Sequence, residues 1–200
     1  MIATSPQPTL WRKRSKALFV IGAGTAIVVG LVSGVVWGWW QHHYPYGWSH
    51  CCDKQLYLYL LQYADAHDGS FPKGETTPEA SLSLLQRYFA KEDLAGLLRG
   101  KSVPESVTAE ILARDELLGP ESCGWNYVEG LRNGDSSQLA LFWDNAGLDH
   151  NGGRLPNGGH IVTFVSGNSE YIPESKWPEF IEEQQRLLGE RDPAEKHETK

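Results

Sequence analysis

Oxygen-bearing side chains gather in a glycine-rich stretch of the C-terminal half. Asp144, Asp149 and Asn151 lie within eight residues of one another, and two consecutive glycines follow. Carboxylate and amide oxygens are the ligands that calcium prefers, although no glutamate closes a twelve-residue EF-hand loop here. Because Asp and Asn side chains also hydrogen-bond their own backbone in turns, two interpretations stay open: a calcium site at these three residues, or a solvated turn.

A second group of potential metal ligands lies closer to the N-terminus. Imidazole and thiolate ligate zinc or copper, but the group lacks the C-x-x-C pairs of a structural zinc site and the C-x-x-C-H of haem attachment. A cluster of amphipathic side chains at a membrane surface explains the histidines as well. The group comprises His42, His43, His50, Cys51 and Cys52.

The three cysteines offer one long-range disulfide. Adjacent cysteines seldom bridge each other, so the pairing is Cys51 or Cys52 with Cys123, and we take Cys52 with Cys123 as the candidate. Such a bond requires an oxidising compartment. The alternative is three reduced, buried thiols.

Motifs of known catalytic chemistry are missing from the sequence. Ser166 lacks the G-x-S-x-G context of a nucleophile elbow, and there is no phosphate-binding loop, dinucleotide fingerprint or H-E-x-x-H pair. The histidines have no recognisable nucleophile partner. We therefore predict that the protein is not an enzyme and needs no cofactor, with calcium the only exception left open.

An uncharged apolar segment near the N-terminus predicts a transmembrane helix. Residues 17–40 contain no charged side chain and are long enough to cross the roughly 30 Å hydrocarbon core. Residues 1–16 hold four basic residues, which places this short N-terminus in the cytoplasm by the positive-inside rule. The apolar stretch is too long for a cleaved signal peptide and no suitable cleavage site follows it, so we predict an uncleaved signal-anchor.

Two features of this segment predict its neighbours. Aromatic side chains at its exit are typical of the membrane interface, and small residues at four-residue spacing allow close packing of helices. Glycine is also frequent in membrane helices without such a role. The aromatic residues are Trp37, Trp39, Trp40 and Tyr44, and the small ones are Gly30, Gly34 and Gly38.

The charge of the rest of the chain excludes one class of partner. Of the 18 basic and 25 acidic residues, four basic and no acidic ones precede residue 41, which leaves a formal charge of −11 on residues 41–200. An acidic surface repels nucleic acid, and no basic stripe compensates for it. We predict no nucleic-acid partner.

The order of patterns beyond the membrane segment predicts an α+β domain. Helical spacing predicts helices over about 47–66, from Thr77 to Phe89, over 91–98 and over 105–118. Alternation predicts strands at 125–127, 139–143 and 161–165, with a hairpin at 166–168 leading to a short strand near Tyr171. An amphipathic helix follows Ser175, and the polar residues 189–200 are predicted to fray.

Several fragments in this order resemble one family. The stretch 52–72, which ends in Gly69-Ser70-Phe71-Pro72, is similar to "C-x-x-N-L-K-Q-x-x-x-A-L-x-x-Y-A-x-D-x-x-G-x-F-P" of pilin-like (pseudopilin-type) membrane proteins of planctomycete-like bacteria. Residues 124–131, 142–144, 150–154 and 161–172 resemble its "S-Y-x-Y-V-x-G-L", "A-Y-D", "N-H-x-G-G-R" and "N-V-L-F-A-D-G-H-V-E-W-I". This resemblance to type II secretion G-like proteins implies a pilin-like fold.

The chain departs from that family where assembly is concerned. Pilins carry a leader cleaved before "F-T-x-x-E" and a glutamate inside the membrane helix, whereas this chain has Lys16-Ala17-Leu18-Phe19-Val20 and no glutamate before Glu75. Ser166 and Asn168 stand where the family has Asp and His, and residues 155–159 form an apparent insertion.

These observations predict a bacterial inner-membrane protein with a single pass. Its predicted parts are a cytoplasmic N-terminus (1–16), a transmembrane helix (17–40), a pilin-like extracytoplasmic (periplasmic) domain (41–188) and a polar tail (189–200). We expect a helical stalk and a small antiparallel head closed by a C-terminal helix. The expected role is structural, in an envelope or secretion-type assembly, with homo- or hetero-oligomers formed through the membrane helix. The alternative is a membrane-tethered module that binds a ligand or calcium.

Overall fold

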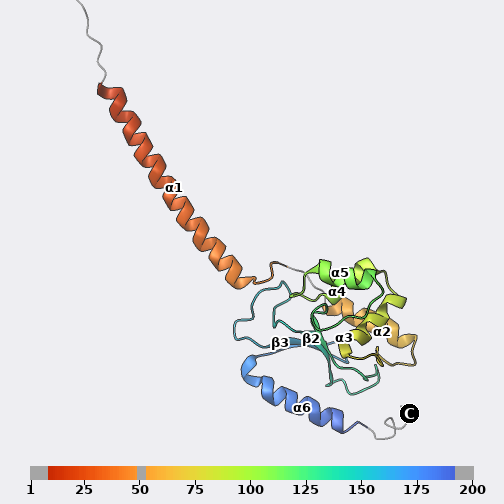
Figure 1. The fold of residues 1–200 in the computed structure, drawn as a ribbon. Coiled ribbons are helices and arrows are strands. Elements are labelled where there is room, and N and C mark those ends of the chain that lie inside the picture. Colours follow the sequence, from red (N-terminus) through yellow and green to blue (C-terminus); the bar gives the residue numbers. More distant parts are fainter. Residues whose placement is uncertain (1–8, 49–52, 192–200) are drawn as a thin grey trace, which may run out of the picture. The chain divides into compact units, whose positions relative to one another are not determined.

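The computed structural model describes residues 9–48 and 53–191, and the chain divides into two compact units between His43 and Tyr44 (Figure 1). The first unit contains helix α1 (Thr9–His43). Its segment Gly22–His43 is long and apolar enough to cross a membrane, a property that a signal sequence shares. The side chains from residue 22 to residue 42 are exposed.

Helix α1 ends at His43, shortly before Pro45. Pro45 has no backbone N–H and disfavours helical geometry in the residue before it. The Gly47 N–H donates to the Tyr44 carbonyl at 3.1 Å, which closes a turn. The predicted second helix was expected to begin near Gly47, but Gly47 and Trp48 lie outside any helix.

The second unit begins with a layer of short helices. They are α2 (Asp53–Asp65), α3 (Pro78–Leu82), the 3₁₀ helix η1 (Ser83–Arg87), α4 (Lys91–Leu98) and α5 (Glu105–Ala113). Thr77 caps α3, with its hydroxyl oxygen accepting the Ala80 N–H at 3.2 Å.

Two helix predictions were too long. The helix predicted from Thr77 to Phe89 changes to 3₁₀ geometry after Leu82. The helix predicted over 105–118 ends at Ala113, because Asp115 adopts the left-handed conformation (φ 56°) and directs the chain back toward η1. There the Leu118 N–H donates to Ser83 Oγ at 2.8 Å.

A four-stranded antiparallel sheet in the order β1-β2-β3-β4 forms the centre of the second unit. The strands are β1 (Trp125–Tyr127), β2 (Ala140–Asp144), β3 (His160–Phe164) and β4 (Ser169–Ile172). The predicted hairpin at 166–168 is present, with the Phe164 N–H donating to the Asn168 carbonyl at 2.9 Å. An irregularity in the β2–β3 register between Ala140 and Phe142 lets these two side chains join different core clusters.

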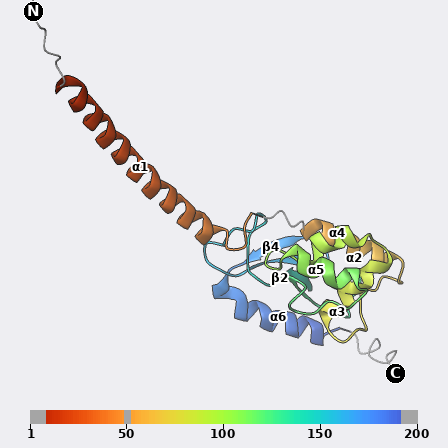
Figure 2. The same ribbon diagram turned by 45° about the horizontal axis from the view of Figure 1, so that its top comes forward.

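Helices cover both faces of the sheet (Figures 1 and 2). Helices α2 to α5 lie over the face that carries Trp125, Tyr127 and Phe142, and together they form the larger core. The terminal helix α6 (Trp177–Gly189), preceded by the 3₁₀ helix η2 (Glu174–Lys176), lies over the other face. The α+β class predicted from the order of patterns is confirmed.

Candidate functional site

A buried lysine stands in the loop that follows α4. Gly100 ends this helix with a left-handed backbone (φ 58°), and its chain packs directly against Gly124 at the start of β1. A Cβ atom on Gly124 would lie 2.1 Å from the Arg99 carbonyl oxygen, so this approach requires glycine. The Gly124 N–H donates to the Leu98 carbonyl at 2.9 Å. These contacts place Lys101 in the interior of the head, with its side chain 1% exposed.

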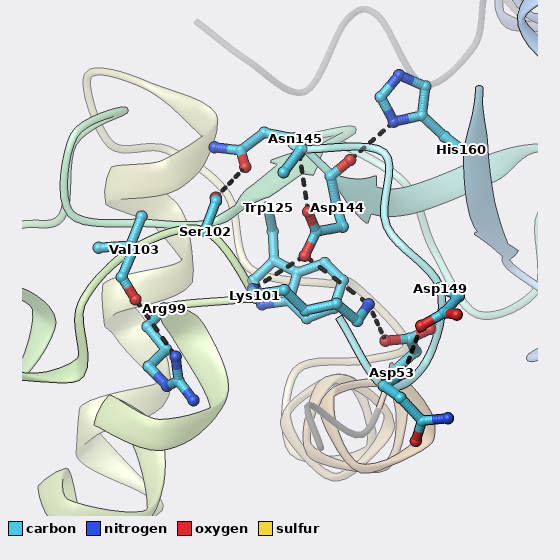
Figure 3. A network of polar contacts seen from close by, with 12 residues as sticks. Asp53, Arg99, Lys101, Ser102, Val103, Trp125, Asp144, Asn145, Asp149 and His160 are labelled. Carbon is cyan, nitrogen blue, oxygen red and sulfur yellow. Dashed lines mark hydrogen bonds and ion pairs between the residues drawn. The ribbon is translucent and has the colours of Figure 1, made fainter. Parts of the chain in front are cut away.

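The Lys101 ammonium lies between two aspartates from distant parts of the chain (Figure 3). Its Nζ atom is 3.3 Å from Asp53 Oδ1, at the start of α2, and 3.8 Å from Asp144 Oδ2, at the end of β2. The Trp125 ring centroid is 5.3 Å from the same nitrogen. The Trp125 Nε1–H donates to the Leu97 carbonyl at 2.8 Å, which fixes the ring.

Asp144 is held more rigidly than a surface carboxylate. Its Oδ2 accepts the backbone N–H of Lys101 at 3.0 Å and its Oδ1 accepts that of Ala146 at 2.8 Å. The Asp144 carbonyl is also hydrogen-bonded, with His160 Nδ1 at 2.9 Å. Both carboxylate oxygens therefore have backbone partners, and the side chain is locked toward Lys101.

Burial dominates the electrostatics of this cluster. The side chains of Lys101, Asp53 and Asp144 are only 1%, 11% and 3% exposed. Burial raises the pKa of Asp144, against the lowering effects of Lys101 and of the two backbone N–H groups, and Asp53 raises this pKa further. With all three groups ionised, the cluster carries one net negative charge in a poorly solvated interior, where isolated charge is unfavourable.

This buried cluster was not predicted from the sequence. Asp144 was singled out as a calcium ligand, whereas Lys101 and Asp53 were not singled out. Lysine is normally a surface residue, and only the flanking Gly100 hinted at a special backbone. Lys101 lies 43 residues from Asp144 and 48 residues from Asp53 along the chain. No short sequence window therefore contains all three residues.

The predicted calcium ligands are divided between two environments. Asp144 faces Lys101 in the interior. Asp149 closes its own loop instead, because its Oδ1 accepts the N–H groups of Asn151 and Gly153, each at 2.8 Å. Within residues 9–48 and 53–191 there is no group of three His, Cys, Asp or Glu side chains placed to hold a metal ion. The calcium site stays a prediction.

The cysteine and histidine predictions concern the start of the head. Cys123 is buried, with Sγ 3.9 Å from the Trp125 carbonyl oxygen. Its predicted partner Cys52, together with His50 and Cys51, lies outside the described residues, so the disulfide stays a prediction. His43 stacks on Trp39 with ring centroids 5.2 Å apart.

The residues predicted to contact the membrane or another helix are accessible. Gly30, Gly34 and Gly38 have no other part of the described chain within 4 Å of a Cβ position. Trp37, Trp39 and Trp40 are exposed at the C-terminal end of α1, whereas Tyr44 is half-buried in the turn that follows.

A groove of about 420 Å³ runs between α6 and the sheet edge formed by β4. Phe164, Ile172 and Phe180 provide its apolar surface, and Glu170 and Glu183 provide carboxylates. Glu183 is paired with Arg186 on the same helix at 2.6 Å. The groove is a second feature of the head that lies apart from the buried cluster.

Comparisons of the chain with protein-family models, with curated proteins and with solved structures return no match.

Proposed function

We propose that this chain is a single-pass membrane protein with a pilin-like extracytoplasmic head and a non-enzymatic, structural or interaction role in an envelope or secretion-type assembly. The observation that carries the proposal is the apolar helix Gly22–His43, whose side chains are exposed as far as residue 42, next to a separately packed unit. An exposed apolar helix is unstable in water and stable in a bilayer, where its backbone groups are satisfied internally. The N-terminus would be cytoplasmic, as the four basic residues before the helix favour.

The order of elements supports the pilin-like description of the head. An apolar N-terminal helix precedes a helix that packs on an antiparallel sheet. On that covering helix, α2, Leu56, Leu60 and Tyr63 are buried. The Tyr57 hydroxyl donates to the Val165 carbonyl at 2.8 Å, which joins α2 to the end of β3. This arrangement agrees with the resemblance carried by residues 52–72 and 161–172.

The role in an assembly rests on the membrane helix. Gly30, Gly34 and Gly38 share one face, because four residues make slightly more than one turn. Without side chains, this face allows a second helix to approach closely, so that van der Waals contacts stabilise the pair. A second copy of the chain or another single-pass protein would pack there.

Cysteine cross-linking in native membranes tests this role. The test variant is Gly34→Cys in a chain whose Cys51, Cys52 and Cys123 are replaced by serine. The matched control is Val36→Cys, two residues further on and therefore about 200° around the helix. We expect self-adducts, or one reproducible heterologous adduct, from Gly34→Cys and none from Val36→Cys. Monomer alone from both variants would refute the proposed packing.

The alternative is a membrane-tethered module that binds a ligand or calcium through its acidic head. It ranks second because Asp144 and Asp149 already accept backbone N–H groups and face different surroundings. A calcium titration followed by thermal unfolding distinguishes the two functions. A melting temperature that rises with calcium would favour the module, since a ligand that binds only the folded state stabilises it.

A further inference from the structure

We propose that Lys101 and Asp53 condense to form an intramolecular amide (isopeptide) bond, and that Asp144 relays the proton for this reaction. The three side chains lie together in the interior of the head (Figure 3). The proposal concerns a covalent modification of the head and does not depend on its assembly role.

The nucleophile and the acceptor are already in contact. Lys101 Nζ is 3.3 Å from Asp53 Oδ1, so the amine is in hydrogen-bond contact with the carboxyl group whose carbon, Cγ, it would attack. Asp53 stands in the first turn of α2 and Lys101 in a loop fixed by the Gly100–Gly124 contact. Holding two groups in this way gives effective molarities on the order of 10⁵ M or more, which favours condensation over the separated amine and acid.

The condensation needs the amine and the carboxyl group in their uncharged forms. An amine attacks only when it is neutral, and a carboxyl group loses hydroxide most readily when it is protonated. Both forms are uncharged, and the side chains of Lys101 and Asp53 are only 1% and 11% exposed. Transfer of one proton from the Lys101 ammonium to the Asp53 carboxylate converts the ion pair into a neutral amine and a neutral acid. The summed charge of the two groups is zero before and after the transfer.

Asp144 is positioned to move protons without reacting itself. Its Oδ2 lies 3.8 Å from Lys101 Nζ, beyond the distance to Asp53, and backbone N–H groups hold both its oxygens. Its raised pKa brings proton transfer closer to neutral pH, where a general acid and base is most effective. The Trp125 ring and the rest of the cluster exclude bulk water from the same nitrogen.

The reaction balances without any other reagent. The Lys101 amine attacks Asp53 Cγ and forms the N–C bond. Asp144 accepts the proton released from the nitrogen and delivers it to the departing hydroxyl of Asp53. The C–O bond breaks, one water molecule leaves, and Asp144 returns to its initial state. Nothing is oxidised or reduced.

Intact mass spectrometry of the full-length protein in detergent, with reduced and alkylated cysteines, tests the proposal. The comparison protein is Lys101→Met, purified in parallel, so that processing of the N-terminus affects both equally. We expect the wild-type chain to be lighter than its sequence requires by one water molecule, and the variant to match its sequence. Equal agreement of both with their sequences would overturn the proposal.

Peptide mapping locates the lost water. We expect a chymotryptic peptide with Asp53 joined to one with Lys101, and no tryptic cleavage after Lys101. Cyclisation at Asp68-Gly69 also loses one water, but that loss would appear in both proteins and within one peptide. Finding it there alone, or finding Lys101 joined to another residue, would refute the assignment. In Asp144→Asn, checked for folding by circular dichroism, we expect at least a tenfold slower or incomplete reaction, as for loss of a general acid and base.

Discussion

Replacing Lys101 with methionine tests the electrostatic account of the buried cluster. The substitution keeps an unbranched side chain of similar length but removes the cation, so Asp53 and Asp144 remain buried beside each other. Breaking a buried pair by removing one partner destabilises proteins by roughly 3–5 kcal/mol. We expect the free energy of unfolding of Lys101→Met to fall by about this amount at pH 7, a large part of the usual 5–15 kcal/mol.

The raised pKa of Asp144 determines how the free energy of unfolding changes with pH. Burial raises the pKa of Asp144, so the folded state holds a proton at pH values where the unfolded state has lost it. Stability from this group is therefore present at low pH and is lost as pH rises above the ordinary value of 3.8 toward the raised pKa. As a cation, before any amide forms, Lys101 lowers the pKa of Asp144 and opposes that loss. Without Lys101 the loss is larger, and the difference between variant and wild type should shrink as pH falls from 7 toward 4.

The same measurement separates the charge effect from the proposed covalent bond. A bond between residues 53 and 101 closes a loop spanning 48 positions. By the chain-entropy model for cross-links, such a loop contributes roughly 4 kcal/mol, and this contribution does not titrate. Its loss would lower the stability of Lys101→Met at every pH. In that case the titrating part comes from the Asp53 carboxylate, which the substitution leaves free and buried beside Asp144.

Urea unfolding monitored by far-ultraviolet circular dichroism and tryptophan fluorescence, between pH 4 and 7.5, measures both parts. The triple variant Lys101→Met, Asp53→Asn, Asp144→Asn serves as the control, because none of these three buried positions then carries an ionisable side chain. Its stability should depend on pH less than that of the single variant. A destabilisation by Lys101→Met below about 1 kcal/mol at pH 7, the range of surface pairs, would refute the reasoning. A difference from wild type that is equal at pH 4 and pH 7 would refute the charge account.

Three further predictions concern the head. Gly124→Ala places a Cβ 2.1 Å from the Arg99 carbonyl oxygen and should destabilise the head by at least about 1–3 kcal/mol in urea unfolding, whereas Gly96→Ala in α4 has open space and should stabilise it by about 0.5–1 kcal/mol. Similar effects of the two would contradict the close backbone contact. Burial raises the pKa of Tyr127 well above 10.0, so stability should fall as pH rises beyond that value, and Tyr127→Phe should flatten this fall while losing about 1 kcal/mol with the hydrogen bond to the Pro72 carbonyl. An alkaline unfolding profile unchanged by the substitution would contradict it. Gln184→Ala removes the bonds that join α6 to the Ala140 N–H and the Gln138 carbonyl and should speed hydrogen exchange at Ala140, while the neighbouring Gln185→Ala should not. Equal exchange in both would show that α6 is held by its apolar face alone.

The periodicity of the sequence was sufficient for the class of the fold. The uncharged run 17–40 predicted a long helix, and α1 contains the whole of it. Alternation located the strands to within a residue, since one face of each strand is buried. Helix ends were less predictable. The helix predicted to reach residue 118 stops at Ala113, because Leu118 bonds to Ser83 in another element.

The candidate site depended on tertiary structure. Nothing local distinguishes Lys101 from a surface lysine, because its burial follows from the contact of Gly100 with Gly124, across 24 positions of the chain. The sequence also assigned Asp144 to a surface loop with Asp149, whereas the antiparallel register of β2 with β1 sets Asp144 opposite Trp125. Periodicity records which side of an element is apolar, and so it determined the amphipathic helices and the strands of the sheet. Which polar groups meet inside that head depends on long-range packing, and only the folded chain brings Asp53, Lys101 and Asp144 together.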